Sequence, residues 1–264
     1  MKKTIILLFV FNFCLSQQKT IKASYELIRE KNGYSFTADG YVLVDNKSKK
    51  SIFKLSQYNN LLKNAKKVFD KEENDSIVVV GSTSICTDDK EYYFDFKNKL
   101  KKQILYNVNC KSKVLIEEKL TYPKWEILNE FKEISGYKTQ KAIATINDRI
   151  WTVYFTKDLK ENIAPWNLIG LPGAIIEANE NSSVYNFKLL KIEYINVENE
   201  IVIPSFKTKL SFEEFVKKAV KQNREEMIFK LSQLEGVDAE NIEPDTFPLY
   251  ETLDFIENRK LNNE

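Results

Sequence analysis

The chain of 264 residues contains no histidine. Without an imidazole it cannot build a Ser-His-Asp or Cys-His nucleophile arrangement, and the commonest zinc sites are excluded as well. Glycine is also scarce, and the seven glycines form no GxGxxG or P-loop pattern for nucleotide phosphates. These absences favour a binding protein over an enzyme, and the sequence predicts no metal site and no cofactor.

Long apolar runs are absent except at the N-terminus. Lys2 and Lys3 precede an apolar stretch from Thr4 to Leu15, which is too short to span a bilayer. Small residues, Cys14 and Ser16, stand before Gln17. This pattern predicts a signal peptide over residues 1–16 and an exported protein, located in the periplasm, at the outer membrane or outside the cell. The alternative is a buried N-terminal strand.

Neither sign of charge is in excess. The chain has 40 basic and 38 acidic residues, and removal of residues 1–16 takes away two lysines and leaves 38 of each. A neutral chain has no general attraction for nucleic acid, so we expect no nucleic-acid partner. No later segment is apolar for long enough to form a transmembrane helix.

Cysteine is rare as well, and only Cys86 and Cys110 would remain after cleavage. Two cysteines in an exported chain predict one disulfide between them, and the alternative is a pair of buried free thiols.

Alternating apolar and polar residues dominate the rest of the chain, which is typical of β-strands. Asp45 to Lys50 separates two such runs as a hairpin. Residues 137–145 and 149–155 form another pair around Asn147-Asp148, where both turn residues tolerate a positive φ. The pattern predicts ten or so strands in one mainly β (α+β) domain over residues 17–264, with a curved antiparallel sheet or a partly open barrel.

One long helix is predicted to pack against this sheet. Ser211 and Glu214 form a capping box, and apolar residues then follow at helical spacing from Phe212 to Leu234, before Gly236. Shorter helices are predicted at residues 60–69 and 248–260, and a short β-branched run occupies residues 77–80.

The segment APWNLIGLPGAIIEAN, residues 164–179, holds two of the seven glycines and two of the six prolines. Leu171-Pro172-Gly173-Ala174 fits a type II turn, in which Gly173 supplies the positive φ. The preceding residues are too apolar for a solvated loop. They either close one end of the curved sheet as a plug or form a rim that binds a ligand or partner. The candidate binding residues are Pro165, Trp166, Leu168, Gly170, Leu171, Pro172 and Gly173.

Acidic residues offer little for catalysis. Glu117-Glu118 and Asp88-Asp89 are adjacent pairs, whose side chains point to opposite faces of a strand. The acidic cluster of residues 70–75 lacks the spacing of a calcium loop. A carboxylate-based hydrolase of envelope glycans or peptides remains an alternative, because such carboxylates meet in space rather than along the chain.

The GLPGAI segment, together with Gly136-Tyr137, Lys141-Ala142, Arg149 and Trp151, resembles the GLPGLI family of exported proteins from Bacteroidetes. The resemblance covers about residues 125–193. Ala174, Ala164 and Thr139 depart from the residues that the family places there, namely leucine, glycine and cysteine. The family has no established activity, so the resemblance implies membership and export but no site.

The expected architecture is also similar to the open barrels of periplasmic lipoprotein carriers, which is an analogy of fold alone. From these features we expect a non-enzymatic envelope protein that binds a lipid, an apolar peptide or an outer-membrane protein partner. The alternatives are the hydrolase and a structural or assembly subunit whose apolar loop is covered by a partner chain.

Overall fold

The computed structural model describes residues 20–31, 34–58, 90–106, 113–182, 184–196, 201–206 and 209–233. Several sequence-based predictions lie outside these ranges: the signal peptide of residues 1–16, Cys86 and Cys110 with their disulfide, Asp88-Asp89, the acidic cluster, the run 77–80, Gly236 and the two shorter helices.

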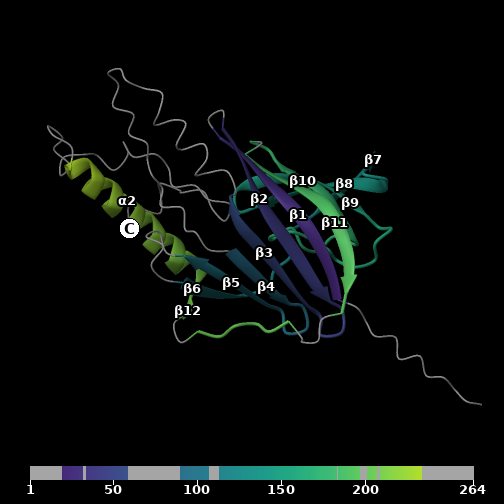
Figure 1. The fold of residues 1–264 in the computed structure, drawn as a ribbon, viewed down its shortest axis with the longest axis horizontal. Coiled ribbons are helices and arrows are strands. Elements are labelled where there is room, and N and C mark those ends of the chain that lie inside the picture. Colours follow the sequence, from purple (N-terminus) through teal and green to yellow (C-terminus); the bar gives the residue numbers. More distant parts are fainter. Residues whose placement is uncertain are drawn as a thin grey trace, which may run out of the picture.

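Within the described residues, twelve strands form one sheet, and one long helix follows them (Figure 1). The sheet order is β12-β6-β5-β4-β3-β2-β1-β11-β10-β9-β8-β7. The strands are β1 (Thr20–Lys31), β2 (Tyr34–Asp45), β3 (Lys50–Tyr58), β4 (Lys90–Asp95), β5 (Leu100–Tyr106), β6 (Lys113–Lys119), β7 (Glu126–Ile134), β8 (Tyr137–Ile146), β9 (Arg149–Thr156), β10 (Ala174–Glu180), β11 (Tyr185–Ile195) and β12 (Lys209–Leu210); the helix is α2 (Phe212–Ser232).

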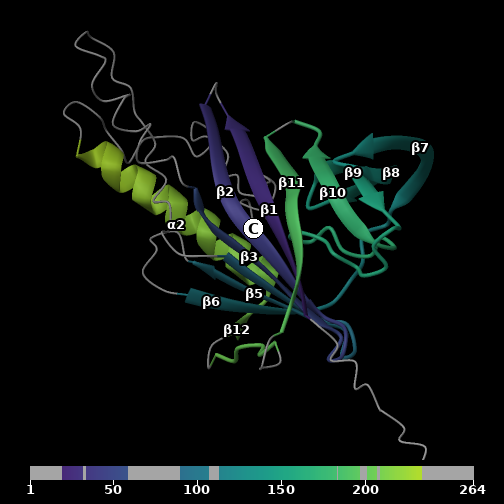
Figure 2. The same cartoon turned by 45° about the vertical axis from the view of Figure 1, so that its right-hand side comes forward.

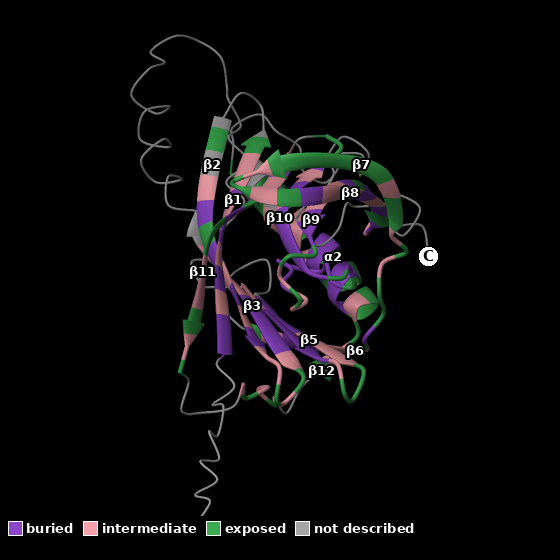
Figure 3. Ribbon diagram, turned by 90° about the vertical axis from the view of Figure 1, so that its right-hand side faces the viewer, coloured by how far each residue is buried: buried purple, intermediate pink, exposed green. Residues whose placement is uncertain are grey.

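The sheet joins two series of antiparallel hairpins. One series runs from β1 to β6 and the other from β7 to β11, and β1 pairs with β11 to unite them. The sheet is strongly curved and open, with β12 and β7 at its two edges (Figures 2 and 3). The prediction of a mainly β, curved antiparallel sheet with one helix is therefore confirmed, with twelve described strands rather than ten or so. One pairing departs from it, because β12 runs parallel to β6.

The turns have the backbone geometry that their residues favour. Asn147 and Asp148, between β8 and β9, have φ values of 51° and 61°, as the sequence predicts for this hairpin. The hairpin at residues 45–50 also forms, and the Asp45 carboxylate accepts hydrogen bonds from the Lys47 amide and the Ser48 hydroxyl.

The core lies on the inner face of the curve because alternate residues of nearly every strand point there. Phe53 of β3, Trp151 of β9 and Phe187 of β11 are each at most 1% exposed and belong to one continuous apolar cluster. A smaller cluster covers part of the outer face, where residues 201–206 pack against Ile52 and Tyr93.

Helix α2 begins at the predicted capping box. The Glu214 amide donates to Ser211 Oγ at 3.2 Å, and the Glu214 carboxylate accepts from the Ser211 amide at 2.8 Å. The helix then buries Phe215, Val216 and Ala219 in the main core cluster. The predicted long helix is confirmed, and it fills one end of the space inside the curve (Figure 3).

Asp95, at the end of β4, holds its turn through hydrogen bonds from the Asn98 amide at 2.9 Å and from Asn98 Nδ2 at 2.8 Å. Burial by itself would raise the pKa of Asp95, but these hydrogen bonds and the charge of Lys50 together lower it. A lowered pKa in the folded state stabilises the protein above the pKa of the unfolded chain, about 3.9, and this contribution is lost as the pH falls through the folded-state pKa.

We therefore expect Asp95→Asn to lower the free energy of unfolding more at neutral pH than in acid, because only the ionised carboxylate gives the full contribution. Urea unfolding of both proteins at neutral pH and below the unfolded pKa measures the difference. Asp148→Asn, at an exposed residue of another turn, is the matched control. An equal loss at both pH values would contradict the role given to the ionised Asp95.

Candidate functional site

The connection between β9 and β10 folds back into the curve of the sheet as a plug. We call Ile163–Gly173 the plug loop. The Ile163 amide donates to the Gly173 carbonyl at 3.2 Å, and the Ile175 amide donates to the Ile163 carbonyl at 2.9 Å, so both ends of the loop are closed by backbone hydrogen bonds. Tyr25 of β1 also donates its hydroxyl to the Ile175 carbonyl at 2.7 Å.

Trp166 is the centre of the plug loop, and its side chain is 0% exposed. Its ring centroid lies 5.3 Å from that of Trp151, and Trp151 stacks on Phe187 at 5.9 Å. Phe187 in turn meets the edge of Phe53 at 5.9 Å, so the aromatic contacts run from the plug loop across β9 and β11 to β3. Trp166 has a φ of +49°, a conformation that costs a non-glycine residue about 1–2 kcal/mol and that the surrounding packing must offset.

Two glycines allow the loop to reach this position. Gly173 has a φ of +120°, the positive value required by the turn predicted there. A Cβ at Gly173 would lie 2.0 Å from the Thr156 carbonyl oxygen, so a larger residue would have to displace the backbone. Gly170 has a φ of +101°, and a Cβ there would lie 3.0 Å from the Tyr122 ring.

The structure covers most of the predicted binding residues with the chain's own core. Of the seven candidates, Gly170 and Pro172 are exposed. The buried ones are Pro165, Trp166, Leu168, Leu171 and Gly173.

An open pocket of about 570 Å³ lies beside the plug loop. Tyr122, which is 53% exposed, and Pro123 come from the segment between β6 and β7. Ile146 comes from the end of β8, and Asn167 and Ile169 come from the plug loop. The other lining residues are Lys101, Thr121, Lys124, Thr145 and Asn147.

Two contacts hold the plug loop against this segment. Trp125 Nε1 donates to the Ile169 carbonyl at 2.9 Å, and Tyr122 packs on Gly170. Asn167 is 8% exposed, lines the pocket and makes no hydrogen bond through its side-chain amide to the described residues. The pocket thus combines an aromatic surface with one amide that makes no hydrogen bond to the described residues. Neither Tyr122 nor Asn167 could be predicted as a site residue, because a polar residue in an apolar loop and an exposed tyrosine are common features.

Two described carboxylates, Asp45 and Glu161, line one open pocket. Burial would raise the pKa of Asp45, but hydrogen bonds from Ser48 and Lys47 lower it. Glu180 is buried and lies 3.5 Å from Arg149 Nη1, and it also accepts a hydrogen bond from Ser182. Glu117 and Glu118 pair with lysines of neighbouring strands. The pKa of Glu117 is lowered, first by its hydrogen bond from Lys209 and then by that from Lys102. A general acid requires a raised pKa, so Asp45 and Glu117 offer no support for hydrolysis.

Two further findings concern the described part of the chain alone. Its side chains form no cluster of three or more cysteine and acidic residues that could hold a metal ion. The helix within it is not apolar enough over its length to cross a membrane.

Because Trp166 is fully enclosed, we expect Trp166→Ala to lower the free energy of unfolding by about 3–5 kcal/mol. Tyr122→Ala, at an exposed ring on the other side of the plug loop, should change it by no more than about 1 kcal/mol. Chemical denaturation of the three proteins measures both effects. A Trp166 variant as stable as the wild type would show that the ring is not part of the core.

No protein-family model and no curated protein matches the chain. Among solved structures it is similar to PNGF-II, in two space groups, with 16% identity over 78% of this chain and TM-scores of 0.48 and 0.47. The chain spans about a third of the length of PNGF-II, 33% and 34% in the two structures.

It is also similar to a domain of the outer membrane lipoprotein-sorting type from Vibrio parahaemolyticus, with 8% identity, a TM-score of 0.31 and coverage of 76% of this chain and 91% of the other. A LolA-superfamily protein from Nitrosomonas europaea shows 8% identity and a TM-score of 0.29, covering 68% and 88% of the two chains. At these scores the similarities do not assign the chain to a family.

Proposed function

We propose that this chain is a non-enzymatic binding protein that holds an apolar ligand with a hydrogen-bonding group in the pocket beside the plug loop. The observation that carries the proposal is the side-chain amide of Asn167, which makes no hydrogen bond to the described residues and lines a pocket that also exposes the Tyr122 ring. Ligand sites typically combine apolar and aromatic surface with a few placed polar groups, and this pocket has both.

The Asn167 amide restricts the chemistry of the ligand. A pure hydrocarbon would exclude water from the amide without replacing its hydrogen bonds, which costs about 1–3 kcal/mol. A ligand with an amide or ester group satisfies Asn167, while its apolar part covers Tyr122 and Ile169. Apolar peptides and acyl lipids both present this combination.

The charges around the pocket point to the same class of ligand. Lys124 is exposed at the pocket, and Lys101 is held by Glu118 at 3.0 Å. None of the described residues that line it is a carboxylate. A positively charged ligand would find no counter-charge there, so the pocket favours a neutral or anionic molecule.

Export belongs to the same proposal. It is supported by the charged and apolar N-terminal segment, which would be removed after Ser16 to leave a single domain from residue 17. Membership of the GLPGLI family, with Cys86 and Cys110 joined as a disulfide, is supported by the residues from Gly170 to Ile175 and by the cysteine count.

We expect the purified mature chain to bind a dansyl-labelled phospholipid or a dansyl-labelled apolar peptide, and the two titrations distinguish the ligand sources. Tyr122→Ala and Asn167→Leu should each weaken binding about tenfold, which corresponds to the loss of about 1.4 kcal/mol of contact energy. Asn167→Leu should leave the protein as stable as before, because it removes an unpaired polar group.

Tyr194→Ala is the matched control, because Tyr194 is equally exposed, at 57%, on β11. Equal effects of the Tyr122 and Tyr194 substitutions would contradict binding at this pocket. The same holds if neither probe binds the wild type and mass spectrometry of natively purified protein finds no retained ligand.

A further inference from the structure

The two edge strands of the sheet differ in length and in exposure. At one edge β12 has only two residues, whereas β7 at the other edge has nine, nearly all of them exposed (Figure 3). Phe131 and Ile127 of β7 are 67% and 45% exposed. Among the described residues, β7 pairs only with β8, so its outer backbone groups have no strand partner. A long exposed edge strand is a template for a further strand.

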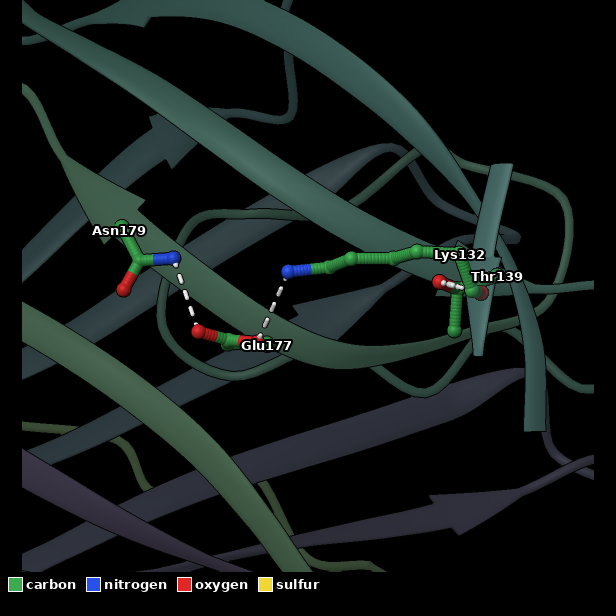
Figure 4. A network of polar contacts seen from close by, with 4 residues as sticks. All are labelled: Lys132, Thr139, Glu177 and Asn179. Carbon is green, nitrogen blue, oxygen red and sulfur yellow. Dashed lines mark hydrogen bonds and ion pairs between the residues drawn. The ribbon is translucent and has the colours of Figure 1, made fainter. Parts of the chain in front are cut away.

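The side chains of β7 are held in defined positions by the neighbouring strands. Lys132 Nζ lies 3.5 Å from Glu177 Oε2 (Figure 4). It also lies 3.5 Å from the centroid of the Tyr154 ring. Glu130 Oε2 lies 2.9 Å from Lys141 Nζ. Lys141, Tyr154 and Glu177 form one cross-strand row. Glu130 and Lys132 therefore share the outer face of the sheet, and Phe131 between them faces the inner side.

We propose that two copies of this chain associate through their β7 strands, antiparallel, about a two-fold axis that passes beside Phe131. Directly opposite residues of an antiparallel pair have their side chains on the same face of the sheet, whereas neighbouring residues of one strand alternate between faces. A two-fold axis perpendicular to the sheet must therefore pass beside a residue and not between two residues. Centred on Phe131, it places Glu130 opposite Lys132 of the second copy, and this pair occurs twice by symmetry. The two Phe131 rings then lie opposite each other, an arrangement that stabilises antiparallel pairs.

Neighbouring registers lose this complementarity. A centre at Glu130 would place Lys132 opposite Leu128 of the second copy, and a centre at Lys132 would place Glu133 opposite Phe131. Charges opposite apolar residues gain no partner, so of these three registers the one centred on Phe131 pairs the central charges. In that register the sequence of β7 is complementary to itself.

The backbone of β7 also limits the number of residues that can pair in the proposed contact between two copies. Its pairing with β8 is irregular between Ile127 and Phe131, where Gln140 Nε2 donates to the Leu128 carbonyl at 2.9 Å. The regular pairing is therefore short, and we expect a weak dimer rather than a permanent one. A two-fold pair uses both β7 edges, so it closes and does not extend into a filament.

Sedimentation velocity of the mature full-length chain over a concentration series tests the dimer. We expect a monomer–dimer equilibrium in the wild type. Glu130→Lys and Lys132→Glu should each weaken it about tenfold or more, because each places like charges opposite one another twice. Lys191→Glu, at a 64% exposed lysine of β11, is the matched control and should leave the equilibrium unchanged.

Sedimentation velocity of a mixture of the two weakened variants is the decisive test. The Glu130→Lys variant has a lysine at both 130 and 132, and the Lys132→Glu variant has a glutamate at both positions. In a mixed dimer, each lysine of one copy therefore lies opposite a glutamate of the other. We expect the mixture to recover the wild-type dimer fraction. A wild type that is monomeric throughout, a dimer insensitive to both variants, or a mixture that stays monomeric would each overturn the proposal. Ligand binding in the pocket beside the plug loop is measured separately on the monomeric variants, so the two proposals can fail independently.

Discussion

The burial of the plug loop against the inner face of the sheet is the contact on which the rest of this structure depends. A twelve-stranded sheet curved this strongly encloses a space that its own side chains do not fill, and apolar surface left inside would be exposed to water. Trp166 fills the centre through Trp151, and α2 fills one end through Phe215 and Val216. The strained φ of Trp166 and the crowded backbone at Gly173 are local costs that this burial offsets.

Local chemistry was readable from the sequence. Asn147-Asp148, the Ser211–Glu214 capping box and the positive φ at Gly173 each depend on neighbours a few residues away, and each was predicted. The alternation of apolar residues likewise predicts most strands, because the inner face of the sheet is buried. What the loop of residues 164–179 packs against was left open between a plug and a rim.

Contacts between distant segments could not be predicted in the same way. The pocket brings together the segment before β7, the end of β8 and the plug loop, and no periodicity links these. Asn167 acquires significance only because the fold places its amide in the pocket with no hydrogen-bond partner among the described residues, and Tyr122 only because it lies on Gly170. Of the residues singled out in the loop, the large apolar ones form the core, and the pocket is instead lined by their neighbours Asn167 and Ile169. The parallel pairing of β12 with β6 is equally non-local.

The central claim is that the plug loop belongs to the folded core and is not a mobile rim. Hydroxyl-radical footprinting of Trp166 tests it most directly, because this ring is 0% exposed and is reached by the radical only when the loop leaves the sheet. The account predicts that Trp166 is modified as slowly as Tyr92, a fully buried ring of β4. Modification at the rate of the exposed Tyr122 ring would show that the loop opens while the sheet stays folded, and would contradict it.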